Sequence, residues 1–281
     1  VWGASFLFIA VGLEAFSPPV ITFVRLALGA LTLVWLPGAR RPVDRDDWPA
    51  LALLGLLWMT IPLLLFPVAQ LWVDSSVAGM VNGSMPVFTA VVSTVLLRRL
   101  PGGLQAIGIL VGFAGVVAIT LPSSLGAQAS PEGVLLLVLA VCLYAVAANM
   151  AVPLQQRYGA LAVTLRAQAV ALTLVSPFAL VGALDSHWSW TSAAALVPLG
   201  VLGSGVAFVA MTTLVGRVGA TRGALAIYFT PIVAIVLGVV VRNESVHPLA
   251  LVGTALVIGG AWLTSRPERI RLPAAVPASG R

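Results

Sequence analysis

The chain has 281 residues, of which 60% are hydrophobic and only 9% are charged, and its formal net charge is +6. Its mean hydropathy is +1.07, whereas a soluble domain uses about 25% charged residues to cover its surface. This composition excludes an ordinary soluble protein and predicts an integral membrane protein. All fifteen basic residues are arginines. Because all but two of them lie near the ends of apolar stretches or in the tail, membrane orientation explains them better than nucleic-acid binding does.

Ten apolar stretches approach the length of about 20 residues that a helix needs to cross a bilayer. We expect membrane-spanning helices near 1–16, 18–37, 50–72, 76–97, 104–122, 131–152, 161–183, 192–213, 219–241 and 247–265. Polar or proline-rich segments separate these stretches, and Ser17-Pro18-Pro19 predicts a tight hairpin between the first two. The first stretch is already apolar at Val1, so we expect its helix to be shortened there. The tail 266–281, rich in proline, alanine and arginine, is expected to be disordered and cytoplasmic.

The arginines also predict which way the helices run. If the N-terminus is cytoplasmic, twelve arginines fall on the cytoplasmic side, Arg242 falls outside, and Arg25 and Arg166 fall within helices. Arginine near a helix end resists translocation and therefore accumulates on the cytoplasmic side. The sequence thus predicts a multi-pass protein of the inner (plasma) membrane with both termini in the cytoplasm.

Two halves of the chain resemble each other in residue pattern. A shift of 141 residues superimposes Arg25 on Arg166, and a shift of 145 residues superimposes Pro86 on Pro231. We therefore expect one five-helix repeat at 1–122 and a second at 131–265, followed by the tail. Because each repeat holds an odd number of helices, the two must be inverted relative to each other, an arrangement that supports alternating access around a site at mid-depth.

Short motifs at both ends of the chain resemble a known family. The opening Trp2-Gly3-Ala4-Ser5-Phe6, with Ser17-Pro18 and Arg25, is similar to the start of an EamA-type repeat. The closing motifs are Pro231-Ile232-Val233, Asn243-Glu244, Gly253 and Gly259-Gly260. The resemblance, which covers nearly the whole chain, is to EamA-type transporters of the drug/metabolite transporter superfamily. It implies ten transmembrane helices as two inverted five-helix repeats, and export of amino acids or similar small metabolites.

The chain departs from the family pattern at one place. Arg98-Arg99-Leu100 stands in the first half where the family commonly has an acidic residue matching Glu244. This difference argues against a role for a symmetric pair of acids.

Arg25 and Arg166 each place a charge inside a predicted helix, where it costs about 2.5–3.5 kcal/mol or more. Such a cost is tolerated where the charge meets a partner, a water-filled cavity or a ligand. One hypothesis is that these arginines contact an anion such as a substrate carboxylate. The alternative is a structural role, in which the guanidinium binds backbone carbonyls at a helix end.

Pro86 and Pro231 are expected in the middle of their helices, where proline removes a backbone hydrogen bond and kinks the chain. We interpret them as candidate hinges beside a transport cavity, with purely structural bends as the alternative. Asn82 and Tyr228 precede these prolines by four and three residues, so both are candidate substrate contacts at a similar depth.

Other polar or aromatic side chains interrupt the apolar stretches. Tyr144, Asn149 and Gln168 are expected to face the interior of the bundle, as substrate contacts or as partners in hydrogen bonds between helices. Trp2 is a candidate for the substrate pocket, with an interfacial aromatic as the alternative. Glu14, at a helix end, is a candidate proton-coupling carboxylate, although ordinary solvation explains it as well.

Enzymatic chemistry is not predicted. His187 and His247 are both expected in loops, so no histidine inside a helix can activate a serine or complete a metal site. The single Cys142 excludes a disulfide framework. We therefore expect no catalytic residue, metal or cofactor and no nucleic acid, with a small-molecule substrate and the lipid bilayer as partners. An intramembrane enzyme acting on lipid, and a membrane sensor or scaffold without transport, remain as alternatives. The sequence leaves open whether the protein is a monomer or a homodimer.

Overall fold

The computed structural model describes residues 1–96, 101–124 and 130–265, and every regular element in these residues is a helix. The predicted tail 266–281 and the pair Arg98-Arg99 lie outside the described residues. The all-helical architecture predicted from composition is therefore confirmed for the described part of the chain.

The helices of the first half follow the predicted stretches closely. They are α1 (Trp2–Gly12), α2 (Pro18–Val34), η1 (Pro37–Arg40), η2 (Arg45–Asp47), α3 (Trp48–Leu54), η3 (Gly55–Thr60), α4 (Ile61–Ala69), α5 (Ser75–Asn82), α6 (Met85–Leu96) and α7 (Gly103–Ser124). Prolines stand at the start of several of them, as with Pro18 and Pro19 of α2. A first-turn proline is favourable because its missing N–H group would have no partner within the helix.

The second half repeats this order of long and interrupted helices. Its elements are α8 (Pro131–Tyr158), α9 (Ala160–Gly182), α10 (Trp190–Pro198), η4 (Leu199–Val206), α11 (Ala207–Val218), α12 (Ala220–Gly223), η5 (Ala224–Ile227), α13 (Phe229–Arg242) and α14 (Pro248–Ser265). Glycines with positive φ, Gly159 and Gly219, form the turns before α9 and α12. These two turns require a backbone conformation that other residues rarely adopt.

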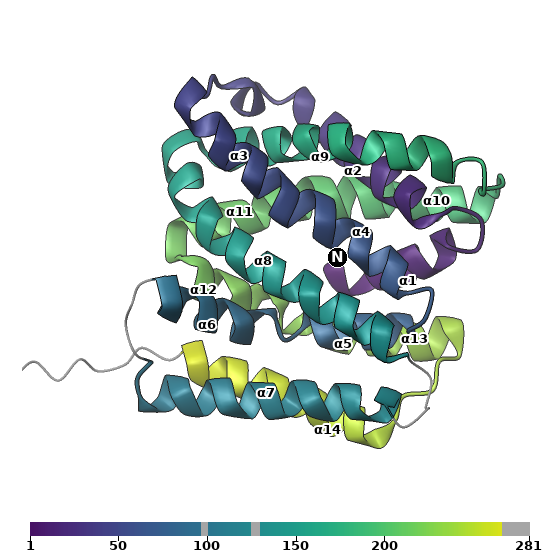
Figure 1. Cartoon of the computed structure of the whole chain (residues 1–281), viewed down its shortest axis with the longest axis vertical. Coiled ribbons are helices and arrows are strands. Elements are labelled where there is room, and N and C mark those ends of the chain that lie inside the picture. Colours follow the sequence, from purple (N-terminus) through teal and green to yellow (C-terminus); the bar gives the residue numbers. More distant parts are fainter. Residues whose placement is uncertain (97–100, 125–129, 266–281) are drawn as a thin grey trace, which may run out of the picture.

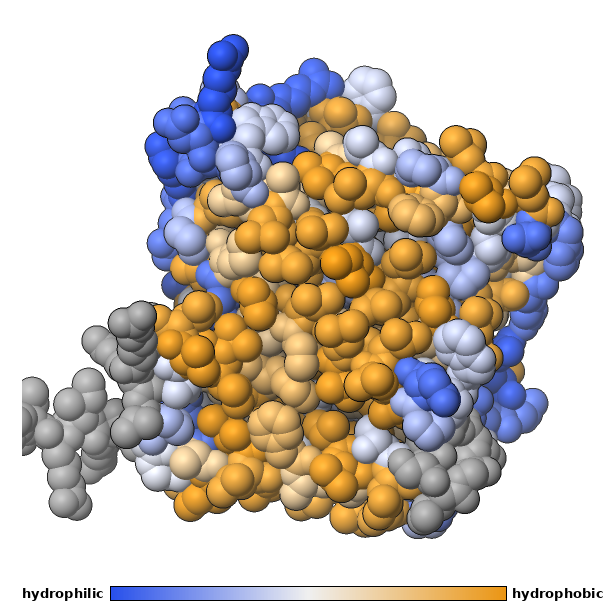
Figure 2. Space-filling view, viewed as in Figure 1, coloured by the Kyte–Doolittle hydropathy of each residue, from blue (hydrophilic) through white to orange (hydrophobic). Residues whose placement is uncertain are grey.

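The helices have the lengths and surfaces of membrane spans. Among the described residues, seven helical segments are long and apolar enough to cross a bilayer, and α1, α2 and α13 are shorter apolar helices. The helices run from left to right in Figure 1. In the same view, Figure 2 shows apolar side chains over the middle of the molecule and hydrophilic ones gathered where the helices end. An apolar belt with polar ends matches the solvation that a bilayer provides.

Close packing of glycines joins α7 and α14, which lie side by side along one edge of the molecule (Figure 1). A Cβ atom built at Gly260 would lie 2.6 Å from the carbonyl oxygen of Gly108, and one at Gly115 would lie 2.6 Å from that of Gly253. Small residues let helix backbones approach this closely, and van der Waals contact then stabilises the pair in lipid.

The predicted spans 76–97 and 219–241 are both interrupted in the middle. α5 ends at Asn82 and α6 begins at Met85, while α13 begins at Phe229 after the short segments α12 and η5. The prediction that Pro86 and Pro231 kink continuous helices is therefore wrong, because each proline lies in the first turn of a new helix. The first-turn N–H groups of a helix have no acceptor within it, so proline fits there without losing a hydrogen bond.

The two interruptions face each other across the repeats. A Cβ atom at Gly83, between α5 and α6, would lie 3.0 Å from Cδ of Pro231 in α13. Discontinuous helices that meet in this way are frequent around the central sites of transport proteins. The role of the prolines as hinges stays a prediction.

Each half also contains one π-helix, which the sequence patterns did not predict. η3 covers Gly55–Thr60 and η4 covers Leu199–Val206. The two coincide under the 145-residue shift that pairs the prolines. π-Helical turns are rare and occur frequently at functional sites, because they rotate the side chains that follow.

Candidate functional site

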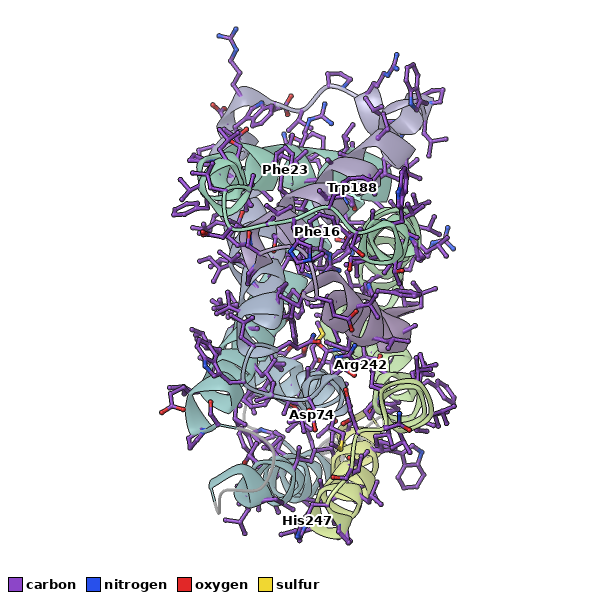
Figure 3. The ribbon with its side chains drawn as sticks, turned by 90° about the vertical axis from the view of Figure 1, so that its right-hand side faces the viewer. Phe16, Phe23, Asp74, Trp188, Arg242 and His247 are labelled. Atoms are coloured by element: carbon purple, nitrogen blue, oxygen red, sulfur yellow. The ribbon has the colours of Figure 1, made fainter. Side chains whose placement is uncertain are left out.

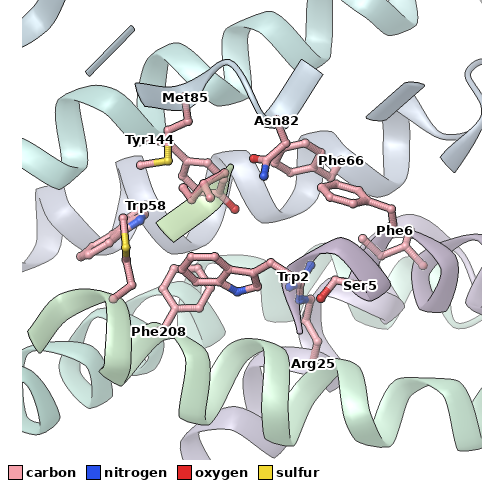
Figure 4. A pocket seen from close by; sticks show the side chains of 13 residues that line it. Trp2, Ser5, Phe6, Arg25, Trp58, Phe66, Asn82, Met85, Tyr144 and Phe208 are labelled. Carbon is pink, nitrogen blue, oxygen red and sulfur yellow. The ribbon is translucent and has the colours of Figure 1, made fainter. Parts of the chain in front are cut away.

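A small cavity lies among the central helices, where α1 begins and where α5 gives way to α6. Its volume is about 40 Å³, which is room for a few water molecules and far below the roughly 300–1,000 Å³ of pockets that hold small molecules. Figure 4 shows the side chains of the thirteen residues that line it. They are Trp2, Ser5, Phe6, Ile9, Arg25, Trp58, Phe66, Asn82, Met85, Tyr144, Phe208, Met211 and Ile227. Both halves of the chain contribute, and the cavity must widen to admit a metabolite.

Arg25 is the one charged residue in this lining. It lies seven residues after the start of α2, which corresponds to about 10 Å along the helix, and only 3% of its surface is exposed. Its Nε donates a hydrogen bond to Ser204 Oγ at 3.0 Å. No carboxylate of the described residues forms an ion pair with it. A buried charge without a counter-ion is costly, so the site favours an anionic ligand.

Ser204 connects Arg25 to a second predicted residue. The Nε2 atom of Gln168 donates to the backbone oxygen of Ser204, and both residues are fully buried. Gly29, one turn beyond Arg25, allows the close approach: a Cβ atom there would lie 3.0 Å from Gln168 Nε2 and from Ser204 Cβ. The π-helix η4 and the helix α9 therefore hold the guanidinium in place.

Aromatic rings form most of the remaining wall. Trp2 donates from Nε1 to the backbone oxygen of Gly203 at 2.9 Å, and its ring meets Phe208 edge to face with the centroids 5.3 Å apart. Trp58 meets the same Phe208 ring at 5.7 Å, and Phe66 meets Tyr144 at 5.7 Å. Such aromatic pairs contribute about 0.5–1.5 kcal/mol beyond the burial of their area. Trp2 therefore lies in the cavity wall.

Neutral polar groups complete the lining. Asn82 and Tyr144 lie across the cavity from Trp2 and Arg25 (Figure 4). Asn82 is 5% exposed and Tyr144 is 8% exposed. Among the described residues, neither side chain has a hydrogen-bond partner, and Ser5 bonds only weakly to the oxygen of Val1 at 3.4 Å. These groups can therefore accept or donate hydrogen bonds to a ligand.

Besides Gln168, which is connected to the cavity only through Ser204, three more of the predicted substrate contacts are absent from the cavity lining. Asn149 accepts from Ser93 Oγ at 2.8 Å and donates to the oxygen of Ala145, so it links α6 to α8. Arg166 donates to the backbone oxygens of Ala39, Arg41 and Ala162, as in the structural alternative. Tyr228 lies between η5 and α13 and is absent from the cavity wall. The two arginines that match in sequence thus occupy different environments.

Several residues of the site were not singled out in the sequence, and four of them bind Arg25 or form the aromatic wall. These four are Ser204, Trp58, Phe66 and Phe208. Aromatic residues are common in apolar helices, so their type alone gives no signal. Ser204 lies in the run Gly203-Ser204-Gly205, and a polar residue between glycines in a membrane helix was the one available signal.

One end of the bundle, seen face-on in Figure 3 with Asp74 and Arg242 labelled, is called the Glu14 end. There Arg242 of α13 forms an ion pair with Glu14 of the α1–α2 turn. The Glu244 carboxylate accepts hydrogen bonds from the Ser75 and Ser76 N–H groups at 3.0 and 2.8 Å, and so caps α5. Both interactions join the first half of the chain to the second. Glu14, a candidate for proton coupling, has a cationic partner here.

The opposite end of the bundle, called the Arg157 end, also joins the two halves. Arg157, at the end of α8, pairs with Asp44 at 2.5 Å and with Asp47 at 2.6 Å in the α2–α3 connection. The Tyr158 hydroxyl donates to the same two carboxylates. Polar contacts therefore join the two halves at both ends of the described structure.

Asp74 gives a test of the Glu14 end. Burial, and then the nearby Glu244, raise the pKa of Asp74 above its usual range, while Arg242 partly opposes the shift. A raised pKa means that the ionised carboxylate destabilises the folded state, and that this effect disappears as the pH falls toward about 4. Asp74→Asn removes the charge and keeps the size of the side chain, which in Asp74 makes no capping hydrogen bond to α5. We expect a modestly higher melting temperature at pH 7–8 and no gain near pH 4. A gain that is the same at both pH values would contradict this assignment.

Interrupted apolar helices around a central cavity, with polar contacts that join the two halves at both ends, are typical of membrane transport proteins. The model of the EamA-like transporter family matches the chain twice, over residues 1–121 and 131–266. The chain therefore belongs to the EamA-like transporter family.

Several named relatives agree with this class. The chain is 29% identical to a probable terminal-alkyne amino-acid exporter of Streptantibioticus cattleyicolor, over 94% of this chain and 90% of that protein. It is 25% identical to the transporter YdfC of Bacillus subtilis, over 94% and 87%, and 26% identical to the inner membrane transporter YedA of Escherichia coli, over 92% and 85%. A solved crystal structure with 20% identity covers 94% of this chain and 93% of its own, with a TM-score of 0.67, which shows a shared fold.

Proposed function

We propose that the protein is a secondary transporter that exports amino acids or similar small metabolites by alternating access around the central cavity. The observation that carries this proposal is Arg25, a buried cation without a carboxylate partner among the described residues, in a cavity that both halves line. A substrate carboxylate would supply the missing counter-ion through charge-assisted hydrogen bonds. Trp2, Asn82 and Tyr144 would contact the remainder of the substrate.

The arrangement of the helices supports alternating access. The described residues contain seven long apolar segments and three shorter apolar helices, and we assign these to ten spans in inverted five-helix repeats at 1–122 and 131–265. Separate contacts close the two ends, Glu14–Arg242 at one and Arg157 with Asp44 and Asp47 at the other. Breaking one set at a time would open the cavity to one side of the membrane only.

A related protein supports the substrate class. The relative in Streptantibioticus cattleyicolor is named as a probable terminal-alkyne amino-acid exporter. Besides its ammonium group, such an amino acid would carry a carboxylate and an apolar side chain. The cavity in this chain offers one cation and six aromatic rings. The same two chemical features would therefore be recognised.

Transport by the purified protein tests the proposal. The protein is reconstituted into liposomes that contain a mixture of amino acids and other small carboxylates, and the loss of each compound is measured against liposomes without protein. We expect at least one carboxylate to leave faster with the protein present. Thermal stabilisation by a compound that is never transported would instead indicate a membrane sensor, and chemical conversion of lipid or substrate would indicate an enzyme. Either result would contradict the proposal.

The proposed orientation places the Glu14 end outside the cell and both termini in the cytoplasm. In a Cys142→Ser background, Asp185→Cys places a thiol on the exposed α9–α10 turn, and Asp46→Cys places one on the exposed α2–α3 connection. A membrane-impermeant thiol reagent added to intact cells should label the cysteine at 185 and spare the one at 46. The reverse pattern would show that the arginine bias misassigns the orientation.

A further inference from the structure

We propose that the cavity selects organic monoanions, with one carboxylate and a flat apolar body, in preference to zwitterionic amino acids of the same shape. This inference rests on the proposed function and, within its substrate class, ranks small carboxylates without an ammonium group above the amino acids. It follows from two features of the lining together: its charge and its aromatic rings.

The cavity lining carries a positive charge and no negative charge. Of the thirteen lining residues, Arg25 is cationic and none is acidic. The acidic residues in the described part of the chain lie at helix ends or in connections, as with Glu14, Asp74 and Glu244 at the Glu14 end. A carboxylate that enters the cavity therefore neutralises the guanidinium, whereas an ammonium group finds no counter-ion there.

An amino acid would bring a second charge close to Arg25. The ammonium and carboxylate groups share one carbon, so binding of the carboxylate to the guanidinium places two cations near each other, where they repel. The acceptors available to the ammonium are the neutral oxygens of Ser5, Asn82 and Tyr144. Hydrogen bonds to these atoms only partly replace the water that the ammonium loses. Attraction to the ring faces offsets about 0.5–2 kcal/mol of this penalty.

The rings determine the shape of the ligand body. Phe208 contacts Trp2 and Trp58 edge to face, and Phe66 contacts Tyr144 at a tilt. These rings come from helices of both halves, so separation of the halves would open a slot between them. A flat apolar group can enter such a slot and replace ring–ring contacts with ring–ligand contacts of similar strength. In the cavity, the Arg25 guanidinium lies beside Ser5 and Trp2 at one side of the rings (Figure 4).

Four compounds that share a benzyl group but differ in charge test this preference. They are 3-phenylpropionate (anion), phenylalanine (zwitterion), 2-phenylethylamine (cation) and 3-phenylpropionamide (neutral). Each is titrated into the detergent-purified full chain, and the dissociation constant is obtained from thermal stabilisation. We expect 3-phenylpropionate to bind roughly tenfold more tightly than phenylalanine, and the amine and the amide to give no stabilisation. Transport of the first two compounds is compared in proteoliposomes.

Two variants connect the preference to the cavity. Arg25→Gln removes the cation and should abolish the advantage of 3-phenylpropionate over the amide. Arg217→Gln removes an exposed arginine at the end of α11 and serves as a charge-matched control that keeps the wild-type ranking. If the Arg25→Gln protein does not fold, the wild-type ranking of the four compounds still decides the question.

The outcomes separate this inference from the proposed function. Phenylalanine binding as tightly as 3-phenylpropionate, or tightest binding by the amine or the amide, would overturn the inference and leave a transporter. If the protein transports other metabolites but binds none of the four compounds, the inference is likewise overturned and the proposed transport function stands. Failure to move any compound of a broad carboxylate mixture would instead overturn the proposed function itself.

Discussion

Replacing Arg25 with glutamine is expected to lower the transport rate about 10- to 100-fold, because hydrogen bonds to charged groups contribute about 1.5–3 kcal/mol each. Glutamine retains hydrogen-bonding capacity toward Ser204 but cannot neutralise a substrate carboxylate. Removal of an unpaired buried charge also relieves a cost in the folded state, so the variant should melt at or above the wild-type temperature. Export from proteoliposomes and thermal unfolding in detergent measure the two quantities on the same preparation.

The conservative variant distinguishes a ligand contact from a structural one. Arg25→Lys keeps the charge but loses the planar set of donors, so we expect intermediate transport with a raised apparent KM. Arg166→Gln removes the repeat-equivalent arginine, which binds backbone oxygens outside the cavity. This variant should have a lower melting temperature, but the ranking of substrates by transport rate should stay as in the wild type. Wild-type transport by a folded Arg25→Gln protein would show that Arg25 is not a substrate contact.

Two adjacent glycines in α14 should respond to alanine in opposite directions. A Cβ atom at Gly260 would lie 2.6 Å from Gly108 O and 2.8 Å from Gly112 Cα, both backbone atoms of α7. Gly260→Ala must therefore push the two helices apart, at a cost of about 1–3 kcal/mol or more. A Cβ atom at Gly259 would meet nothing within 4 Å. Gly259→Ala should instead stabilise the helix by about 0.5–1 kcal/mol.

The pair of variants is read by thermal unfolding and by size-exclusion chromatography in mild detergent. The helix, the mutation and the depth in the membrane are the same, so the difference reports the packing against α7. A lower melting temperature for Gly260→Ala and an equal or higher one for Gly259→Ala are expected. Equal destabilisation by both would mean that α7 and α14 do not pack through the face that contains Gly260.

The sequence was sufficient to predict the helices because membrane spans have a strong signal. An apolar run such as 104–122 has few alternatives once about 20 residues are required, and the structure has a helix there at Gly103–Ser124. Interruptions inside a run were harder to predict. Pro86 and Pro231 indicated irregular backbone, but a proline is compatible with both a kink and a helix start. The surrounding residues remain apolar, so only the structure distinguishes the two.

The candidate site was predictable only where a residue is chemically out of place. Arg25, Asn82, Tyr144 and Gln168 were identified because charge and polarity are costly in lipid. The same criterion selected Arg166. There, however, the cost of placing a charge inside a helix is offset by hydrogen bonds to backbone carbonyl oxygens of a connecting segment, such as that of Ala39. Trp58 and Phe208 carry no such signal, since aromatic residues are common in membrane-spanning helices and cost little there. Their place in the cavity depends on which face of a helix points inward, and on π-helix η3 in the case of Trp58.

Access to the cavity from both sides of the membrane is the central claim, and a single cysteine tests it. Ser5 lines the cavity and is 4% exposed, and Ser5→Cys in a Cys142→Ser background is nearly isosteric. A small membrane-impermeant methanethiosulfonate is applied to intact cells and, separately, to inside-out vesicles. The account predicts slow modification of the thiol from each side, since each end opens in turn, and protection by a transported carboxylate. Modification from one side only, or from neither side in a folded protein, would contradict alternating access around this cavity.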